Sequence, residues 1–178
     1  MDNEKNVDIK AIIGLGNPGK KYYHTRHSIG FAIADELAQR YGASWKEKDN
    51  MELAEININR KKLFLVKPQT FMNDSGKVVP YLLKKGIKPE NILVVHDELE
   101  MPVGKMKIKF GGSARGHNGL RSIMSIIGKE FHRLCFGISR PEKREEVADY
   151  VLQVFSQNKE DIAELIIKAA DMLEDALG

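Results

Sequence analysis

Residues 11–27 read AIIGLGNPGKKYYHTRH, an apolar run that enters a glycine loop. The loop contains Gly14-x-Gly16-x-x-Gly19, which matches the dinucleotide-binding fingerprint on paper. A dinucleotide site needs these glycines to lead directly into a helix, whose amides hold the pyrophosphate. Pro18 instead removes an amide from the loop, and KKYYHTRH has no helical apolar face. The stretch therefore predicts a strand that ends in a sharp polar turn, without a dinucleotide.

The polar residues after this strand form the first candidate site. Asn17, Tyr22, His24 and His27 follow a strand end, and α/β proteins usually bind ligands at the carboxyl edge of the sheet. Each type has an ordinary structural alternative, because asparagine before proline is common in turns and a lone histidine is usually a surface or core residue. The case for a site therefore depends on other segments.

Apolar periodicity predicts the fold class. Strands are expected in DIKAIIGL, LAEINI, KKLFLVK, NILVVH, MKIKF and HRLCFGIS, and helical spacing occurs at 29–37, 78–83, 120–127 and 162–176. Ser28 is the expected N-terminal cap of the first helix, and Asn158 lies near the start of the last. Strands mixed with helices indicate an α/β domain with helices on both sheet faces, and NINRKKL predicts an antiparallel hairpin. No linker or repeat interrupts the chain, which predicts a single domain over residues 1–178.

Composition excludes several classes of protein. The chain has 178 residues, of which 42% are hydrophobic and 30% charged, as in soluble globular proteins. The polar N-terminus, MDNEKNVDIK, is unlike a signal peptide, and no apolar run approaches the roughly 20 residues of a membrane-spanning helix. Cys135 is the only cysteine, so an intrachain disulfide cannot form, and a reducing cytoplasm is the expected location.

Charge is distributed unevenly, although the formal net charge is only +3. Residues 101–144 contain ten Lys/Arg against two acids, whereas residues 145–178 contain nine acids against two lysines. Such asymmetry favours a polyanionic partner for the middle of the chain. An equal alternative is scattered solvated charge that the acidic C-terminal part balances in space.

Three further segments place polar residues at strand ends or at a helix start. TFMNDSG follows a strand and contains Asn73 beside apolar residues, and LVVHDELEMP ends a strand in His96 and Asp97. A carboxylate there can orient an imidazole and support it as a base. GGSARGHNGLRSI enters a helix with free amides and arginines that suit phosphate. Helix capping is the structural alternative for Asn73 and Asn118.

Several kinds of catalytic site are absent from the sequence or poorly matched by it. It contains neither a G-x-S-x-G nucleophile elbow nor an H-E-x-x-H zinc motif. Cys135 lies in HRLCFGI, where an apolar strand position is expected rather than a reactive thiol. Metal binding through His24, His27, His96 and Asp97 stays open as an alternative. The candidate site is nevertheless richer in amides than in carboxylates, and amides suit an amide or ester substrate better than a hard metal.

Four motifs resemble, in order and spacing, the bacterial peptidyl-tRNA hydrolase family: GLGNPGKKYYHTRHSIGF, KPQTFMNDSGKVV, VVHDELEMPVGKMKIKFGGSARGHNGL and HRLCFGISRP. The similarity runs from about Ile12 to Val154. The resemblance implies a monomeric, single-domain, three-layer α/β/α fold with a mixed, mostly parallel β-sheet. It also implies hydrolysis of the ester that joins a peptide, or another N-blocked aminoacyl group, to the 3′ end of tRNA. No metal or organic cofactor is expected.

The resemblance also implies roles for individual residues. His27 would be the general base that activates water, Asp97 would orient its imidazole, and Asn17 would help to distinguish blocked from free aminoacyl groups. Substrate-binding roles near the 3′ end are implied for Tyr22, Phe71, Met72, Asn73 and Asn118. An unperturbed imidazole pKa near 6.5 would leave His27 largely neutral at cellular pH, as a base must be.

The basic middle segment gains a role in contacting tRNA phosphates, with Lys105, Lys107, Lys109, Arg115 and Arg133 as the candidates. Two positions depart from the family pattern. Ser28 follows His27 where many members have asparagine, and Cys135 stands where a basic residue commonly follows Arg133-Leu134. We expect these departures to weaken or redistribute tRNA binding and to leave the chemistry intact. The alternatives are a metal-dependent hydrolase or nuclease and a non-catalytic RNA-binding relative.

Overall fold

The computed structural model describes residues 8–178, so most of the polar N-terminal stretch lies outside the described residues. The strands are β1 (Ala11–Gly14), β2 (Lys46–Lys48), β3 (Met51–Ile58), β4 (Lys61–Pro68), β5 (Ile92–Glu98), β6 (Met106–Phe110) and β7 (His132–Gly137). The α-helices are α1 (Ile29–Arg40), α2 (Val79–Lys84), α3 (Asn118–Ile127), α4 (Val147–Val151) and α5 (Lys159–Leu177). All six predicted strands and all four predicted helices are confirmed, whereas β2 and α4 were not predicted.

The strands form one sheet in the order β2-β3-β4-β1-β5-β7-β6. The four central strands run parallel. The outer strands pair antiparallel with their neighbours, and the predicted hairpin is confirmed as β3 and β4. The mixed sheet is therefore parallel at its centre and antiparallel at both edges. Parallel alignment brings the carboxyl ends of β1, β4, β5 and β7 to one edge, where a binding site is expected.

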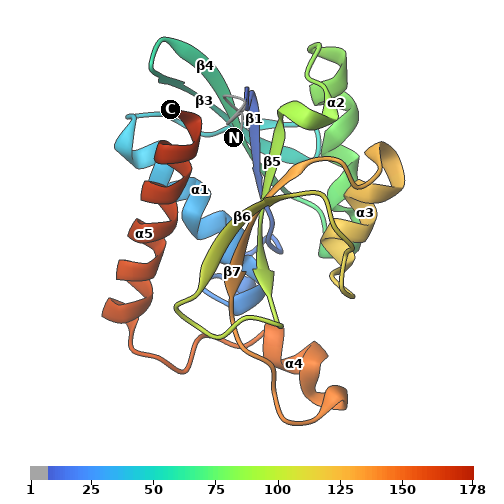
Figure 1. Ribbon diagram of the computed structural model, residues 1–178, viewed down its shortest axis with the longest axis vertical. Coiled ribbons are helices and arrows are strands. Elements are labelled where there is room, and N and C mark those ends of the chain that lie inside the picture. The colour runs from blue at the N-terminus through green and yellow to red at the C-terminus, as the bar shows by residue number, and fades with distance from the viewer. Residues whose placement is uncertain (1–7) are drawn as a thin grey trace, which may run out of the picture.

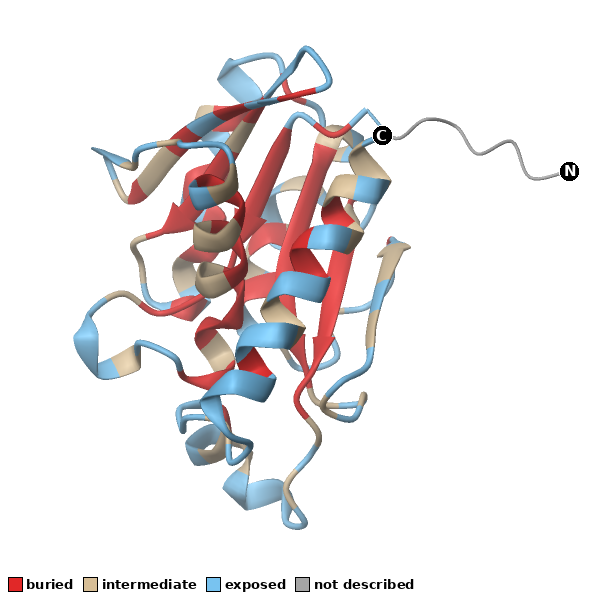
Figure 2. Ribbon diagram, turned by 90° about the vertical axis from the view of Figure 1, so that its left-hand side faces the viewer, coloured by how far each residue is buried: buried red, intermediate tan, exposed pale blue. Residues whose placement is uncertain are grey.

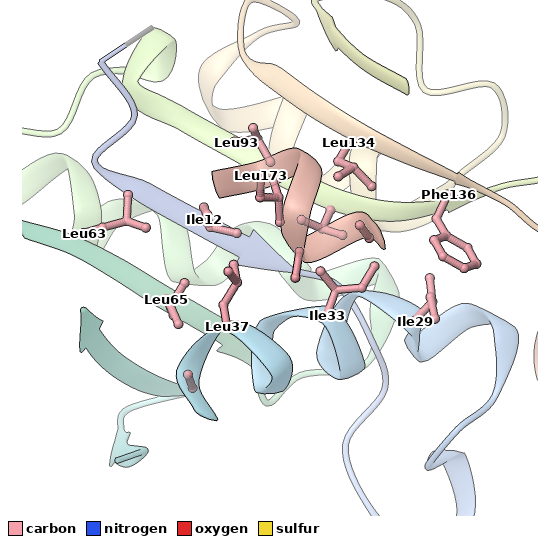
Figure 3. Packing of buried hydrophobic residues seen from close by; sticks show 14 of the residues in the cluster. Ile12, Ile29, Ile33, Leu37, Leu63, Leu65, Leu93, Leu134, Phe136 and Leu173 are labelled. Carbon is pink, nitrogen blue, oxygen red and sulfur yellow. The ribbon is translucent and has the colours of Figure 1, made fainter. Parts of the chain in front are cut away.

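Helices cover both faces of this sheet, as Figure 1 shows. On one face, Ile33 and Leu37 of α1 and Leu173 of α5 pack with Ile12 and Leu93 of the sheet (Figure 3). On the other face, α2 and α3 cover a second apolar cluster. Figure 2 shows that the central strands are buried, whereas α5 turns one face to solvent. The predicted three-layer α/β/α arrangement is confirmed.

The glycines after β1 allow close packing of the backbone. A Cβ on Gly14 would come within 2.2 Å of the carbonyl oxygen of Gly30 in α1, and a Cβ on Gly16 would meet the Phe31 ring at 2.7 Å. Gly19 has a positive φ of 100°, which ends the turn. Because α1 begins well after this loop, the glycines do not present a helix N-terminus to a phosphate. Their pattern comes from the contact between α1 and the sheet.

The polar residues at the starts of α1 and α5 differ in their roles. Asn158 caps α5, since its Oδ1 accepts a hydrogen bond from the Asp161 amide at 2.8 Å. Ser28 occupies the N-cap position of α1 but does not cap it, because its Oγ accepts from the Asn17 amide at 3.1 Å. Among the described residues, no helix combines the length and hydrophobicity that a membrane crossing requires.

Candidate active site

Three polar side chains meet at the carboxyl end of β5. Asp97 belongs to this strand, and only 2% of its side chain is exposed. Nδ1 of His27 lies 3.0 and 2.9 Å from the two carboxylate oxygens, and Nε2 of His117 lies 2.8 Å from Oδ1. His27 comes from a single 3-10 turn before α1, and His117 immediately precedes α3. Three segments far apart in the sequence therefore converge on one carboxylate.

The hydrogen-bond partners of His117 determine its tautomer. Its Nδ1 accepts from the backbone amides of Gly119 at 3.1 Å and Leu120 at 3.3 Å, in the first turn of α3. A ring nitrogen that accepts carries no proton, so the proton of the neutral ring lies on Nε2 and is donated to Asp97. His117 thus caps α3 and holds the carboxylate at once. The sequence carries no signal for this residue, because histidine is not among the side chains that usually mark an N-cap.

His27 keeps one ring nitrogen free. The ionised carboxylate of Asp97 only accepts hydrogen bonds, so Nδ1 of His27 donates to it and the neutral ring has a lone pair on Nε2. This Nε2 makes no hydrogen bond to any residue within 8–178. His27 also lines a cavity of about 570 Å³ that opens to solvent. A general base needs this combination of an oriented ring and an accessible lone pair.

Burial and charge act in opposite directions on the pKa values of this pair. Burial lowers the pKa of His27, but the charge of Asp97 and its hydrogen bond outweigh burial and raise the pKa above the ordinary 6.5. For Asp97, burial raises the pKa, yet the charges and hydrogen bonds of His27 and His117 lower it well below its usual range. The expectation of an unperturbed His27 is therefore wrong. At neutral pH a larger fraction of His27 is therefore protonated than for a histidine with the ordinary pKa.

Asn17 is buried beside this cluster, with 7% of the residue exposed. Its backbone amide donates to Ser28 Oγ at 3.1 Å, and its Oδ1 accepts from the Met72 amide at 2.8 Å. These contacts leave Nδ2 without a partner among the described residues, ready to donate to a substrate carbonyl. Ser28, the first departure from the family pattern, supports Asn17 from the interior, where it cannot act as a surface contact for tRNA.

The remaining substrate-binding candidates are dispersed around the site. Asn118, the first residue of α3, lines the same cavity as His27. Phe71 and Asn73 are exposed, Phe71 by 63%. Tyr22 is half-buried and lines neither of the two largest cavities near the site. Met72 is only 5% exposed and packs in the core under α2 and α3, so the expectation that it lines the cleft is wrong.

Arg133 is not on the surface. It is fully buried, and its guanidinium donates to the carbonyl oxygens of Gly112 at 2.7 Å, Ser113 at 2.8 Å and Lys129 at 3.3 Å. The structure therefore contradicts a direct contact between Arg133 and a tRNA phosphate. The side chain instead ties β7 to the glycine loop that leads to His117. A buried guanidinium needs such acceptors, because burying it without partners is costly.

The other basic candidates are accessible. Lys105 and Lys107 are exposed, Lys109 is half-buried, and none of them forms an ion pair within residues 8–178. Lys107 and Lys109 lie on β6, opposite Cys135 and Arg133 of β7. Arg115 is exposed, and its Nη1 lies 3.0 Å from Glu98 Oε1, so part of its charge is already compensated.

Cys135 and His96 form a separate buried pair. Cys135 Sγ lies 3.5 Å from His96 Nε2, and His96 Nδ1 donates to the Asp97 carbonyl at 2.8 Å. Burial lowers the pKa of His96 to about 3 and raises the pKa of the Cys135 thiol, so both groups are neutral. The predicted buried strand position of Cys135 is confirmed. The metal alternative requires His96 to join the cluster around the Asp97 carboxylate. In the structure His96 bonds to the Asp97 carbonyl and to Cys135 instead.

A metal ion does not fit the three-residue cluster as it is hydrogen-bonded. His27, Asp97 and His117 each place a ligand atom within 4.8 Å of the others. However, metal ligation needs a lone pair on the facing nitrogen, and Nε2 of His117 carries a proton because Nδ1 accepts from two amides. Binding a metal there would require His117 to release the cap of α3.

The fold and this site define a class of protein. A buried aspartate orients a histidine at the carboxyl edge of an α/β sheet, beside asparagine amides and an open cavity. A histidine held in this way with a free ring nitrogen can accept a proton from water, which is chemistry that hydrolases use.

Comparison with known proteins gives the family. The family model described as "Peptidyl-tRNA hydrolase" matches residues 11–178. Peptidyl-tRNA hydrolases from Rickettsia bellii and Listeria welshimeri are each 47% identical to this chain; the alignments cover 92% and 94% of this chain and 89% and 92% of theirs. A crystal structure of peptidyl-tRNA hydrolase from Acinetobacter baumannii is 40% identical, with a TM-score of 0.86 over 95% of this chain and 86% of that chain. The chain belongs to the peptidyl-tRNA hydrolase family.

Proposed function

We propose that this chain hydrolyses the ester bond of peptidyl-tRNA with His27 as the general base. The observation that carries the proposal is the pairing of His27 Nδ1 with Asp97 at 2.9 Å, which leaves Nε2 free beside an open cavity. Nε2 takes a proton from water as the water oxygen attacks the ester carbonyl. Asp97 stabilises the imidazolium that forms, and the imidazolium then protonates the departing ribose oxygen. The products are a free peptide acid and tRNA.

Asparagine amides would stabilise the charge that develops in this reaction. Nδ2 of Asn17 has no partner among the described residues, and Asn118 lines the cavity of His27. A well-placed amide donor to an oxyanion contributes roughly 2.7–4 kcal/mol to transition-state stabilisation. Asn17 is further proposed to select N-blocked substrates, since its amide can donate to the carbonyl of the blocking group. Phe71, Asn73 and Tyr22 remain proposed contacts of the 3′ end.

The tRNA body is proposed to contact the lysines of β6 and the loop before it. Lys105, Lys107 and Lys109 are unpaired within residues 8–178, and Arg115 is exposed. Such groups attract phosphates over a Debye length and give salt-dependent affinity. Arg133 would act only indirectly, by holding the loop of residues 112–113 in place. We further propose a cytoplasmic monomer with one domain over residues 1–178 and no cofactor.

The test is release of N-acetyl-amino acid from N-acetyl-aminoacyl-tRNA in excess EDTA, with unblocked aminoacyl-tRNA alongside. Fast release from the blocked substrate alone is expected, because His27 needs no metal and Asn17 has no blocking carbonyl to bind in the free aminoacyl group. Release that requires added metal would overturn the general-base proposal. No release under either condition would leave a non-catalytic RNA-binding relative as the better account.

A further inference from the structure

Arg26 directly precedes the proposed base and is buried, with only 4% of the residue exposed. It begins the 3-10 turn that carries His27 and ends at Ser28. General-base hydrolysis by His27 makes no direct use of this guanidinium. A buried cation beside the base needs a physical explanation, because taking a guanidinium out of water is costly unless other groups bind it.

The contacts of Arg26 come from the segment around the end of α4, 124 positions later in the chain at Tyr150. Its Nη1 donates to the Tyr150 carbonyl oxygen at 2.9 Å and lies 3.5 Å from Gln153 Oε1. The guanidinium carbon lies 3.8 Å from the centre of the Tyr150 ring. The backbone amide of Arg26 donates to the Gln153 carbonyl at 3.0 Å. One residue thus ties its own turn to the end of α4 through both its main chain and its side chain.

Packing alone does not explain an arginine at this position. No carboxylate within residues 8–178 pairs with Arg26, and its buried Nε has no hydrogen-bond partner there. An apolar side chain would fill the same space without leaving a buried donor unpaired. The planar guanidinium instead stacks on the Tyr150 ring and donates to a carbonyl in the last turn of α4 at the same time. These contacts therefore account for the arginine.

The segment that Arg26 binds also forms a wall of the His27 cavity. Figure 1 shows α4 beyond the carboxyl edge of the sheet. Three of its five residues line the cavity together with His27: Val147, Ala148 and Val151. Tyr150 packs against the core instead, and its hydroxyl donates to the Ile138 carbonyl just after β7. Tyr150 thus joins this wall to the sheet, and Arg26 joins the turn of His27 to Tyr150.

Resting on the proposed function, we propose that Arg26 is a positioning residue that fixes the turn of His27 against the Tyr150 end of α4. Asp97 holds the His27 ring, and Ser28 accepts a hydrogen bond from the loop after β1. Arg26 supplies the remaining contact of the turn, on the side of the cavity wall. Because a misplacement of about 1 Å can lower a rate about 100-fold, a looser turn slows the chemical step.

The first test removes the guanidinium. Arg26→Met keeps much of the side-chain length and should lower kcat at least tenfold, because the turn loses its contact with α4. Arg40→Met is the matched control, since Arg40 joins α1 to Asp171 and Glu174 of α5 and does not line the His27 cavity. Urea unfolding measures the stability of both proteins. Arg40→Met should lose stability and keep kcat within twofold of wild type. Wild-type kcat in a folded Arg26→Met protein would overturn the proposal.

The second test keeps the charge of Arg26 and removes its aromatic partner. Tyr150→Phe and Tyr150→Leu both lose the hydroxyl, but only Tyr150→Leu loses the ring that stacks on the guanidinium. We expect kcat to be at least fivefold lower in Tyr150→Leu than in Tyr150→Phe. The two proteins carry the same charges around His27, including those of Asp97 and His117. A difference between their pH profiles therefore measures geometry.

The sign of that difference follows from the contacts of His27. Asp97 raises the pKa of His27, and burial lowers it. A turn that holds the ring less closely to Asp97 leaves burial to act, so the pKa falls. The base must be neutral, so the acidic limb of kcat should move to lower pH in Tyr150→Leu and stay in place in Tyr150→Phe. A loss of stability alone would not move this limb.

The outcomes separate the positioning role from the proposed function. Equal kcat values and equal acidic limbs in the two Tyr150 variants, with normal wild-type turnover, would overturn the positioning role alone. The Arg26→Met/Tyr150→Leu protein should be no slower than Arg26→Met, because both substitutions remove one contact. Fully additive losses would contradict that shared contact. If the wild-type chain released no product, the proposed function would fail, and the positioning role would fail with it.

Discussion

The carboxyl end of β5 and the edge strand β6 carry charge in opposite ways. At the end of β5, the buried carboxylate of Asp97 accepts hydrogen bonds from His27 and His117, and two backbone amides of α3 hold the second nitrogen of His117. On β6, Lys107 is exposed and Lys109 half-buried, and neither forms an ion pair within the described residues. A buried, fully bonded charge fixes geometry, whereas an exposed, unpaired charge attracts distant phosphates. Substitutions at the first region should therefore change kcat, and substitutions at the second should change KM.

The largest expected effect follows removal of the base. His27→Ala should lower kcat by about 10⁴-fold, the upper range for general-base catalysis, and leave tRNA affinity nearly unchanged. Single-turnover hydrolysis and equilibrium tRNA binding measure the two quantities. His132→Ala is the matched control, because His132 begins β7 at the end of the sheet away from Asp97. Unaltered turnover in the His27→Ala protein would contradict the assignment of the base.

Asp97→Asn should come next, with a loss in kcat of about 10³-fold through the wrong tautomer of His27. Because His117 can offer only its Nε2–H, the oxygen of the introduced amide must face His117 and its NH₂ must face His27. Nδ1 of His27 then accepts a hydrogen bond, and Nε2 carries the proton and cannot act as a base. ¹⁵N NMR of the isotopically labelled His27 ring measures which nitrogen carries the proton. A His27 ring that stays protonated on Nδ1 would contradict this account.

The same variant should change the pH dependence of any residual activity. In the wild-type protein, kcat/KM should rise with pH through a pKa above 6.5, because the base must be neutral and Asp97 favours its protonated form. Loss of the carboxylate charge leaves burial, which lowers the pKa of His27. The acidic limb of the profile should therefore move to lower pH. A limb that moved upward would show that another group controls it.

The sequence allowed the strands, most helices and the position of the site to be predicted, because they depend on local patterns. Continuous apolar runs predicted the strands of the parallel centre, and polar residues after those runs indicated the carboxyl edge. His27 and Asp97 could be named from the family motifs. The distance between their side chains could not be predicted, because it depends on how residues 70 positions apart meet in space.

Contacts that form only on folding explain why the positions of Arg133, Met72 and His117 could not be predicted from the sequence. Arg133 was expected at the surface because arginine usually is, but its strand position turns it inward against carbonyl oxygens. Met72 looked like cleft surface beside Phe71, yet consecutive residues of a turn can face solvent and core. His117 gave no signal, because its role needs both a helix start and a carboxylate from β5. The placement of each of these three residues depends on long-range packing rather than on a local motif.

A smaller effect should separate the two roles of His117. His117→Asn keeps a good N-cap for α3 but cannot reproduce the Nε2–H donor to Asp97, so kcat should fall about tenfold at nearly wild-type stability. His117→Ala loses both contacts and should also cost about 1 kcal/mol of unfolding free energy. Urea unfolding and steady-state kinetics measure the pair. Equal kcat values for wild type and His117→Asn would show that capping is the residue's whole contribution.

The smallest predicted effect lies on the β6 side of the comparison. The Lys107→Ala/Lys109→Ala protein should keep its kcat, because neither lysine touches His27 or Asp97. KM should rise about fivefold, and the slope of log KM against log salt should fall by about 2, since two phosphate contacts are lost. Lys84→Ala/Lys85→Ala, at the end of α2, removes the same charge elsewhere. If both double variants raised KM equally, net charge rather than a contact on β6 would account for the affinity. If only the β6 variant did, the edge strand would be the region that holds tRNA while the buried cluster performs the hydrolysis.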